Sequence, residues 1–335
     1  MIKKEVIMPS QVKEKLRKSV EKMGGCLEEI ERKAENFIKK YKGCLDSSDF
    51  CEIKTKENIR KIIDEMNREE NYIIILRSAS NKEFKKYNKS VDSFIYSYGQ
   101  NNKKILIVYN ENLDDNEEID SLLFRILHEI AHLYLNHTFD KGNQEIDEYI
   151  SEKKEYEANY FASALLLNKK KFKKALKDNR YNLEMISRIY KEMSYEILAH
   201  RCASLSEGEI HLLKTNLGAN QKKGSISKRF MLPIPEDRTI NTEINICNKW
   251  CAVKAFKEQE CKQISTFKNL KDGKDVVYYC YSKLIKKYNK EYTITIGCTE
   301  DFKKNMSQFD DDKNIKTEIF YCFAKEKKCN EECIN

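Results

Sequence analysis

The stretch HEIAHLYLNH, residues 128–137, holds an HExxH pattern, in which two histidines stand four residues apart and a glutamate follows the first. On an α-helix, residues four apart project from the same face, so His128 and His132 can bind one metal ion. Glu129 lies beside that face, where this spacing puts the general base of zinc hydrolases. The stretch therefore predicts a helix that carries two zinc ligands and a catalytic glutamate.

Apolar residues surround the motif and predict that this helix, expected over 121–137, is buried. They are Leu122, Leu123, Ile126, Ile130, Leu133 and Leu135. Buried histidines and glutamates need polar partners, which a metal ion provides. The alternative is a core without metal, in which carbonyls or carboxylates satisfy the histidines. His137 is expected about half a turn round the helix from His128, so it is not predicted to bind the same ion.

A catalytic zinc ion needs a third protein ligand and an open position for water. The segment EYEANYFASALL, residues 155–166, supplies a carboxylate on a helix whose small alanines allow close approach to another helix. Glu155 is therefore the predicted third ligand, and the alternative is a surface glutamate in a charged helix start. Glu157 is expected to point elsewhere, as a solvated surface charge.

The rest of the chain predicts an α+β fold with two domains. It has 335 residues, of which 40% are hydrophobic, and a typical domain takes about 150 residues. Helical patterns occur at 11–41, at 56–69 and, in several pieces that end with 208–215, from 119 to about 217. Strand patterns occur at 72–77, 92–97, 104–109, 275–281, 291–298 and 316–323, and a further helix is possible at 248–262.

A cluster of Gly and Pro residues predicts a linker at 218–236. The first domain is then a mainly helical, zincin-like domain over 1–217, with a small sheet and a helical N-terminal part at 10–69. The second is a smaller, cysteine-rich α+β domain over 237–335.

Composition and charge exclude some classes of protein. The 62 basic and 54 acidic residues give a net charge of +8, and the two signs are interspersed, so a dense nucleic-acid patch is not indicated. The N-terminus lacks the apolar region of a secretory signal, and the longest apolar runs are too short to cross a bilayer. We therefore expect a cytoplasmic protein that does not bind a membrane.

HEIAH, followed downstream by E-x-E-A-N-x-F-A-x-x-L-L, resembles the ImmA/IrrE family of zinc metallopeptidases over roughly residues 10–217. A later segment that contains Ser194 and Arg201 is similar to the closing segment of this family. The resemblance implies that Glu155 is the third zinc ligand and that Glu129 takes a proton from the zinc-bound water. Four residues of this region are candidates for stabilising the oxyanion, and the sequence does not choose among them: Tyr134, Tyr156, His200 and Arg201.

The resemblance also implies a protein substrate, because members of the family cleave transcriptional repressors of mobile elements or stress-response genes. No helix-turn-helix is evident before residue 60, so direct DNA binding is not expected.

Eight of the 12 cysteines follow residue 246, and in a reducing compartment they are expected to be thiols or metal ligands. The C-x-x-W at 247–250, the Gly-Cys that ends at Cys298 and the terminal cysteines resemble the C-terminal domain of short-chain fatty acid regulators. Cys247, Cys298, Cys329 and Cys333 are candidate ligands of an iron–sulfur cluster or a second zinc ion. The alternative is that the cysteines are small buried hydrophobes, which fits Cys280.

Together these features predict a cytoplasmic zinc endopeptidase of regulatory type that cleaves a transcriptional repressor or a similar protein. Two alternatives remain. One is a non-catalytic regulator that uses the peptidase fold as a binding platform, and the other is a thiol or iron–sulfur sensor whose N-terminal half is scaffold.

Overall fold

The structure is a computed structural model. It describes residues 27–45, 53, 55–69, 73–80, 82–83, 93–98, 104–110, 119–137, 144–191, 193–206, 209–217, 224–226, 251–268, 275–287, 290–310 and 316–319. The chain divides into two compact units, Met1–Leu166 and Leu167–Asn335. The fold class is α+β, as predicted.

The first unit contains a three-stranded sheet in the order β1-β3-β2. The strands are β1 (Ile73–Ala79), β2 (Ser93–Tyr98) and β3 (Lys104–Asn110), close to the ranges predicted for them. β1 runs parallel to β3 and β2 runs antiparallel to it. The central strand, β3, is rich in β-branched residues, which favour a pleated and partly buried backbone, and its Ile105 and Ile107 are almost fully buried.

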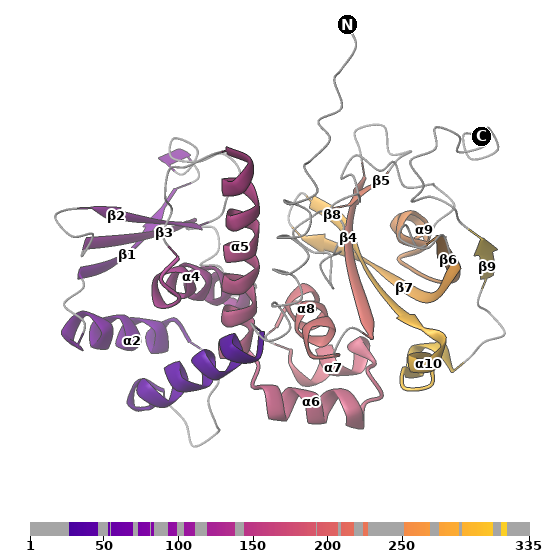
Figure 1. The fold of residues 1–335 in the computed structure, drawn as a ribbon, viewed down its shortest axis with the longest axis horizontal. Helices are drawn as coiled ribbons and strands as arrows, with labels where there is room; N and C mark the ends of the chain where they lie inside the picture. Colours follow the sequence, from indigo (N-terminus) through magenta and orange to yellow (C-terminus); the bar gives the residue numbers. More distant parts are fainter. Residues whose placement is uncertain are drawn as a thin grey trace, which may run out of the picture. The chain divides into compact units, whose positions relative to one another are not determined.

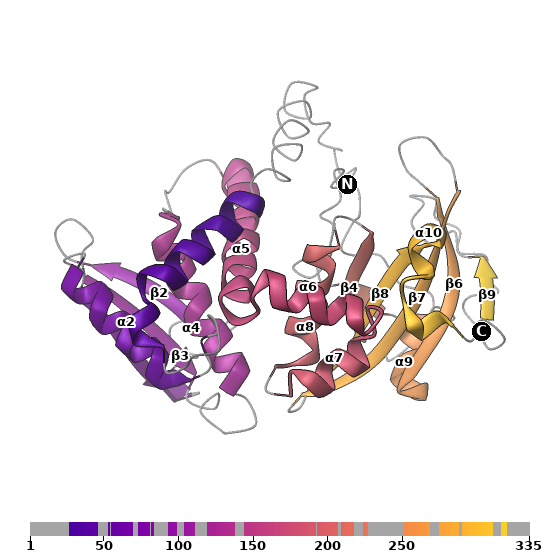
Figure 2. The ribbon, with the colours of Figure 1, turned by 90° about the horizontal axis from the view of Figure 1, so that it is seen from below.

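Helices cover one face of this sheet (Figures 1 and 2). They are α2 (Lys56–Glu69), which contacts β1, and α4 (Ile119–Tyr134), which contacts β2 and β3. α5 (Gln144–Leu166) packs against α4. A further helix at 27–40 is followed by the 3-10 helix η1 (Lys42–Cys44).

An aromatic cluster ties three of these helices together. The ring centroid of Phe37 lies 5.0 Å from that of Tyr134 on α4 and 5.7 Å from that of Phe161 on α5. Tyr160 of α5 also donates a hydrogen bond of 2.9 Å to the carboxylate of Glu31. α4 is thus held between the sheet and two helices, so the predicted burial of the HEIAH helix is observed.

The second unit contains a six-stranded sheet in the order β5-β4-β8-β7-β6-β9. Its strands are β4 (Ile210–Leu217), β5 (Gly224–Ile226), β6 (Glu260–Lys268), β7 (Asp275–Lys287), β8 (Lys290–Thr299) and β9 (Lys316–Ile319). Its helices are α6 (Lys169–Asp178), α7 (Leu183–Ile189), α8 (Tyr195–Leu205), α9 (Cys251–Glu258) and α10 (Glu300–Lys303), with the 3-10 helix η6 (Ser307–Phe309).

Two helices cover opposite faces of the six-stranded sheet. Tyr292 of β8 donates a hydrogen bond to Glu196 of α8, whereas the next residue, Thr293, donates one to the carbonyl of Ala252 in α9. Because successive strand residues point to opposite faces, α8 and α9 lie on different sides of the sheet.

The predicted helix over 208–215 is wrong, because the strand β4 begins at Ile210 and runs to Leu217. β4 pairs with β8, more than seventy positions later in the chain, and with β5, which lies inside the predicted linker. Pairing between strands far apart in sequence decided the conformation of this segment, and a local pattern does not contain that information. The two compact units divide after Leu166; the domain bounds 1–217, 218–236 and 237–335 remain predictions.

Among the helices that the structure describes, none is both long enough and apolar enough to cross a bilayer.

His200 of α8 makes the stability of the protein depend on pH. Burial lowers its pKa to about 4, whereas an unfolded chain has a histidine pKa of about 6.5. Below pH 6.5 the unfolded state binds a proton that the folded state does not bind, so stability falls as the pH drops toward 4. Between pH 7.5 and pH 5 we expect this histidine to cost about 2 kcal/mol of the free energy of unfolding. Denaturant unfolding at both pH values checks this, with His200→Gln as the variant that cannot titrate; an equal loss in both proteins would contradict it.

Candidate metal centre

The end of α4 differs from the predicted helix over 121–137. α4 ends at Tyr134, and Asn136 adopts a left-handed conformation with φ of 54°. The amide of His137 donates a hydrogen bond of 2.9 Å to the carbonyl of His132. The amide of Asn136 donates one of 3.1 Å to the carbonyl of Leu133. These two bonds form a Schellman C-cap, which turns the chain back over the last helical turn.

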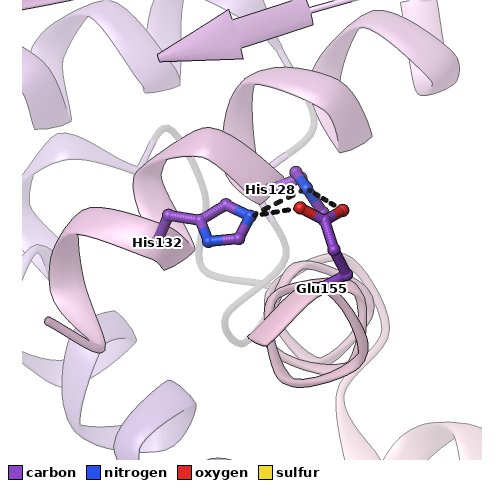
Figure 3. A group of neighbouring side chains, drawn as sticks. All are labelled: His128, His132 and Glu155. Carbon is purple, nitrogen blue, oxygen red and sulfur yellow. Dashed lines mark hydrogen bonds and ion pairs between the residues drawn. The ribbon is translucent and has the colours of Figure 1, made fainter. Parts of the chain in front are cut away.

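Three side chains converge where α4 passes α5 (Figure 3). The Nε2 atoms of His128 and His132 lie 3.1 Å apart. The two carboxylate oxygens of Glu155 lie 3.4 Å from Nε2 of His128 and 3.5 Å from Nε2 of His132. Both histidines are buried and Glu155 is half-buried. The three residues predicted as ligands are thus brought together, and among the described residues no other group of three or more His, Cys, Asp or Glu side chains clusters in this way.

The spacing of these atoms fits a tetrahedral zinc site. Zinc binds nitrogen and oxygen at about 2.0–2.1 Å, so two ligand atoms at tetrahedral corners lie about 3.3–3.4 Å apart. The observed separations of 3.1–3.5 Å match that edge. A cation at the centre of the group would be shared by all three side chains and would accept their lone pairs.

The carboxylate of Glu155 is suited to hold a cation. Burial by itself raises its pKa, but hydrogen bonds from His128 and His132 outweigh burial, and the pKa of Glu155 falls well below its ordinary value. Glu155 is therefore ionised over the whole physiological pH range, as a metal ligand must be.

Glu129 is buried beside the two histidines on α4. The hydroxyl of Ser93, the first residue of β2, donates a hydrogen bond of 2.7 Å to Oε1 of Glu129. This contact holds the carboxylate in one orientation. Sequence reasoning did not single out Ser93, because the two residues are 36 positions apart and no motif links them.

A second set of contacts lies behind His132. Nδ1 of His137 is 3.1 Å from Nδ1 of His132, and Nε2 of His137 is 3.1 Å from Oε2 of Glu157. The prediction that Glu157 is a solvated surface charge is wrong, since its side chain is only 15% exposed and is paired with His137. His137 contacts the outer nitrogen of His132, on the side away from Nε2.

The predicted cysteine ligands lie in a different part of the chain. Cys298 is fully buried in β8, and burial raises the pKa of its thiol to about 12. Cys247, Cys329 and Cys333 lie outside the described residues. Cys280, expected to act as a small buried hydrophobe, is buried in β7.

For two of the four oxyanion candidates, Tyr134 and Arg201, the contacts indicate a structural role. Tyr134 packs in the aromatic cluster with Phe37 and Phe161. Arg201 is fully buried in the second unit, where its Nε donates to the carbonyl of Leu167 at 3.2 Å. Packing in the aromatic cluster accounts for the position of Tyr134, and the hydrogen bond to Leu167 gives the buried guanidinium of Arg201 an acceptor.

Comparison with known proteins gives a family for part of the chain and a fold for most of it. Residues 80–203 match the family model described as IrrE N-terminal-like domain, of the M78 peptidases. No curated protein matches the sequence. The chain is similar to the solved structure of a Mycobacterium tuberculosis transcriptional regulator, with 16% identity, a TM-score of 0.52 and coverage of 83% of this chain and 90% of that chain. At this identity the likeness concerns the fold alone. The HEIAH stretch and the helix of Glu155 both lie within residues 80–203, which are similar to the IrrE N-terminal-like domain of the M78 peptidases, as their sequence resemblance implied.

Proposed function

We propose that the protein is a zinc-dependent endopeptidase of regulatory type. The observation that carries this proposal is the convergence of His128, His132 and Glu155 at separations that suit tetrahedral zinc, inside an M78-type domain. His128 and His132 would bind the ion through Nε2, and Glu155 would bind it through its carboxylate. When bound, zinc would supply the Lewis acidity that polarises the peptide carbonyl and lowers the pKa of water.

Glu129 is the proposed general base. Its carboxylate takes the proton of the attacking water and passes it to the amine that leaves when the peptide bond breaks. The bond from Ser93 to Oε1 holds this carboxylate in place, and Oε2 is the oxygen we assign to the proton transfer. A protein that served only as a binding platform would not need a buried glutamate between two ligands, so Glu129 favours catalysis over that alternative.

The substrate we propose is a transcriptional repressor or a similar protein partner, with the protein acting in a stress response in the cytoplasm. Members of the M78 family act on regulator proteins, and the similar solved structure is itself a transcriptional regulator. We propose no direct contact with DNA.

The cysteine cluster of the tail remains a separate hypothesis. An iron–sulfur cluster or second zinc ion on Cys247, Cys298, Cys329 and Cys333 would make the tail a sensor that governs the peptidase. Binding at Cys298 would have to overcome a thiol pKa raised by burial, which a coordinated metal ion can do because it binds the thiolate.

Elemental analysis tests the metal assignments. We expect about one zinc ion per chain in protein purified without oxygen, and loss of that zinc in His128→Ala and in Glu155→Ala, because three protein ligands are needed for a stable site. Iron and acid-labile sulfide in addition would support the cluster in the tail, and their absence would contradict it. Wild-type protein without zinc would contradict the peptidase proposal.

Cleavage assays test the role of Glu129. With a panel of candidate repressors as substrates, Glu129→Gln should cut at least about 100-fold more slowly than the wild type, because the amide cannot accept the proton. Its zinc content should be unchanged. Glu57→Gln, an exposed change of the same kind on α2, is the matched control and should cleave normally. Equal rates for Glu129→Gln and the wild type would exclude the proposed mechanism.

A further inference from the structure

We propose that His137 and Glu157 form a hydrogen-bonded relay that orients His132 and raises its affinity for zinc. Both are positioning residues, since neither is among the three converging ligands. This inference rests on the proposed function, because it assumes that His132 binds the ion through Nε2.

The relay consists of two contacts in series. Nδ1 of His132 meets Nδ1 of His137 at 3.1 Å, and Nε2 of His137 meets Oε2 of Glu157 at 3.1 Å. The side chains of the two histidines are 3% and 6% exposed, and that of Glu157 is 15% exposed. Water competes little for groups that are shielded in this way, so these hydrogen bonds can fix the positions of the rings.

Zinc on His132 determines every proton position in the relay. If Nε2 of His132 binds the ion, its single ring proton must be on Nδ1, which then donates to His137. Nδ1 of His137 must therefore be the acceptor, so the proton of that ring is on Nε2 and points to Glu157. The ionised carboxylate accepts it. Each ring N–H thus has one acceptor. In this pair of tautomers, Nε2 of His132 carries no proton and can donate its lone pair to a metal ion.

The backbone brings His137 to this place. In a Schellman cap the residue after the left-handed position usually makes an apolar contact with the last turn of the helix. Here that residue is His137, and the residue it meets is His132. The polar pair His132 and His137 thus occupies positions where an apolar pair would stabilise the cap. This indicates that the contact orients the imidazole of His132.

The two histidine ligands differ in their support. Nδ1 of His128 is buried and has no hydrogen-bond partner among the described residues. His132 has the relay behind its ring. A partner on the outer nitrogen of a ligating histidine fixes its orientation and makes it a stronger base toward the metal, so His132 is the ligand whose geometry is set in advance.

Metal affinity of purified full-length protein tests the relay. We would measure the dissociation constant for zinc by competition with a chelator, and the visible spectrum of the cobalt-substituted protein. His137→Phe keeps the ring but removes both hydrogen bonds, and it should weaken zinc binding by about 10- to 100-fold. Glu157→Gln keeps an oxygen acceptor but removes the charge, so its loss should be smaller. Both variants should also change the cobalt spectrum, which reports on the ligand field at His132.

The control is Glu57→Gln, which should bind zinc as the wild type does. The free energy of unfolding of each metal-free protein separates the relay from a purely structural contact. The loss of zinc affinity in a relay variant should be larger than the loss that its change in the free energy of unfolding explains. If His137→Phe does not fold, Glu157→Gln and Glu157→Leu carry the same test.

The outcomes distinguish this inference from the proposed function. Wild-type protein that binds no zinc would overturn both. Wild-type protein that binds one zinc ion, with affinity and cobalt spectrum unchanged in the relay variants, would overturn the relay and leave the peptidase proposal in place.

Discussion

The first unit depends on one constraint: the imidazoles of His128 and His132 and the carboxylate of Glu155 must converge where little water reaches them. Desolvated polar groups are costly unless they share a partner, so the helices that carry them must approach each other closely. Ala158 and Ala162, on the same side of α5 as Glu155, are fully buried and permit that approach. The carboxylate of Glu155 then lies within 3.5 Å of both histidines. The geometry of the centre therefore requires that α4 and α5 pack closely.

Supporting contacts reach the centre from elements far apart in the chain. Ser93 at the start of β2 holds Glu129, and Glu157 on α5 holds His137. The three-stranded sheet contributes little chemistry of its own, but it places the start of β2 against α4. A site built on regular elements in this way is held more rigidly than one built on loops.

The second unit has a different kind of interior. Cys251 at the start of α9 accepts a hydrogen bond from Ser282 of β7, whose hydroxyl also meets that of Thr295 on β8 at 2.7 Å. Burial raises the pKa of Cys251 and of Cys298. The thiols of Cys251 and Cys298 are therefore protonated at neutral pH. Cys280 is buried in β7, in agreement with the alternative raised for it.

The sequence by itself determined which three side chains converge at the centre, because residues four apart on a helix must share a face and because a downstream carboxylate fell on a helix with small residues. It predicted the strands of the first sheet as well, since their β-branched runs are local signals. Only the tertiary structure decided what depends on distant pairing. The local sequence pattern of β4 predicts a helix, but the segment forms a strand because it pairs with β8. His137 reads as the far side of a helix, yet the left-handed turn at Asn136 brings it onto His132, and Glu157 gains its partner from that turn.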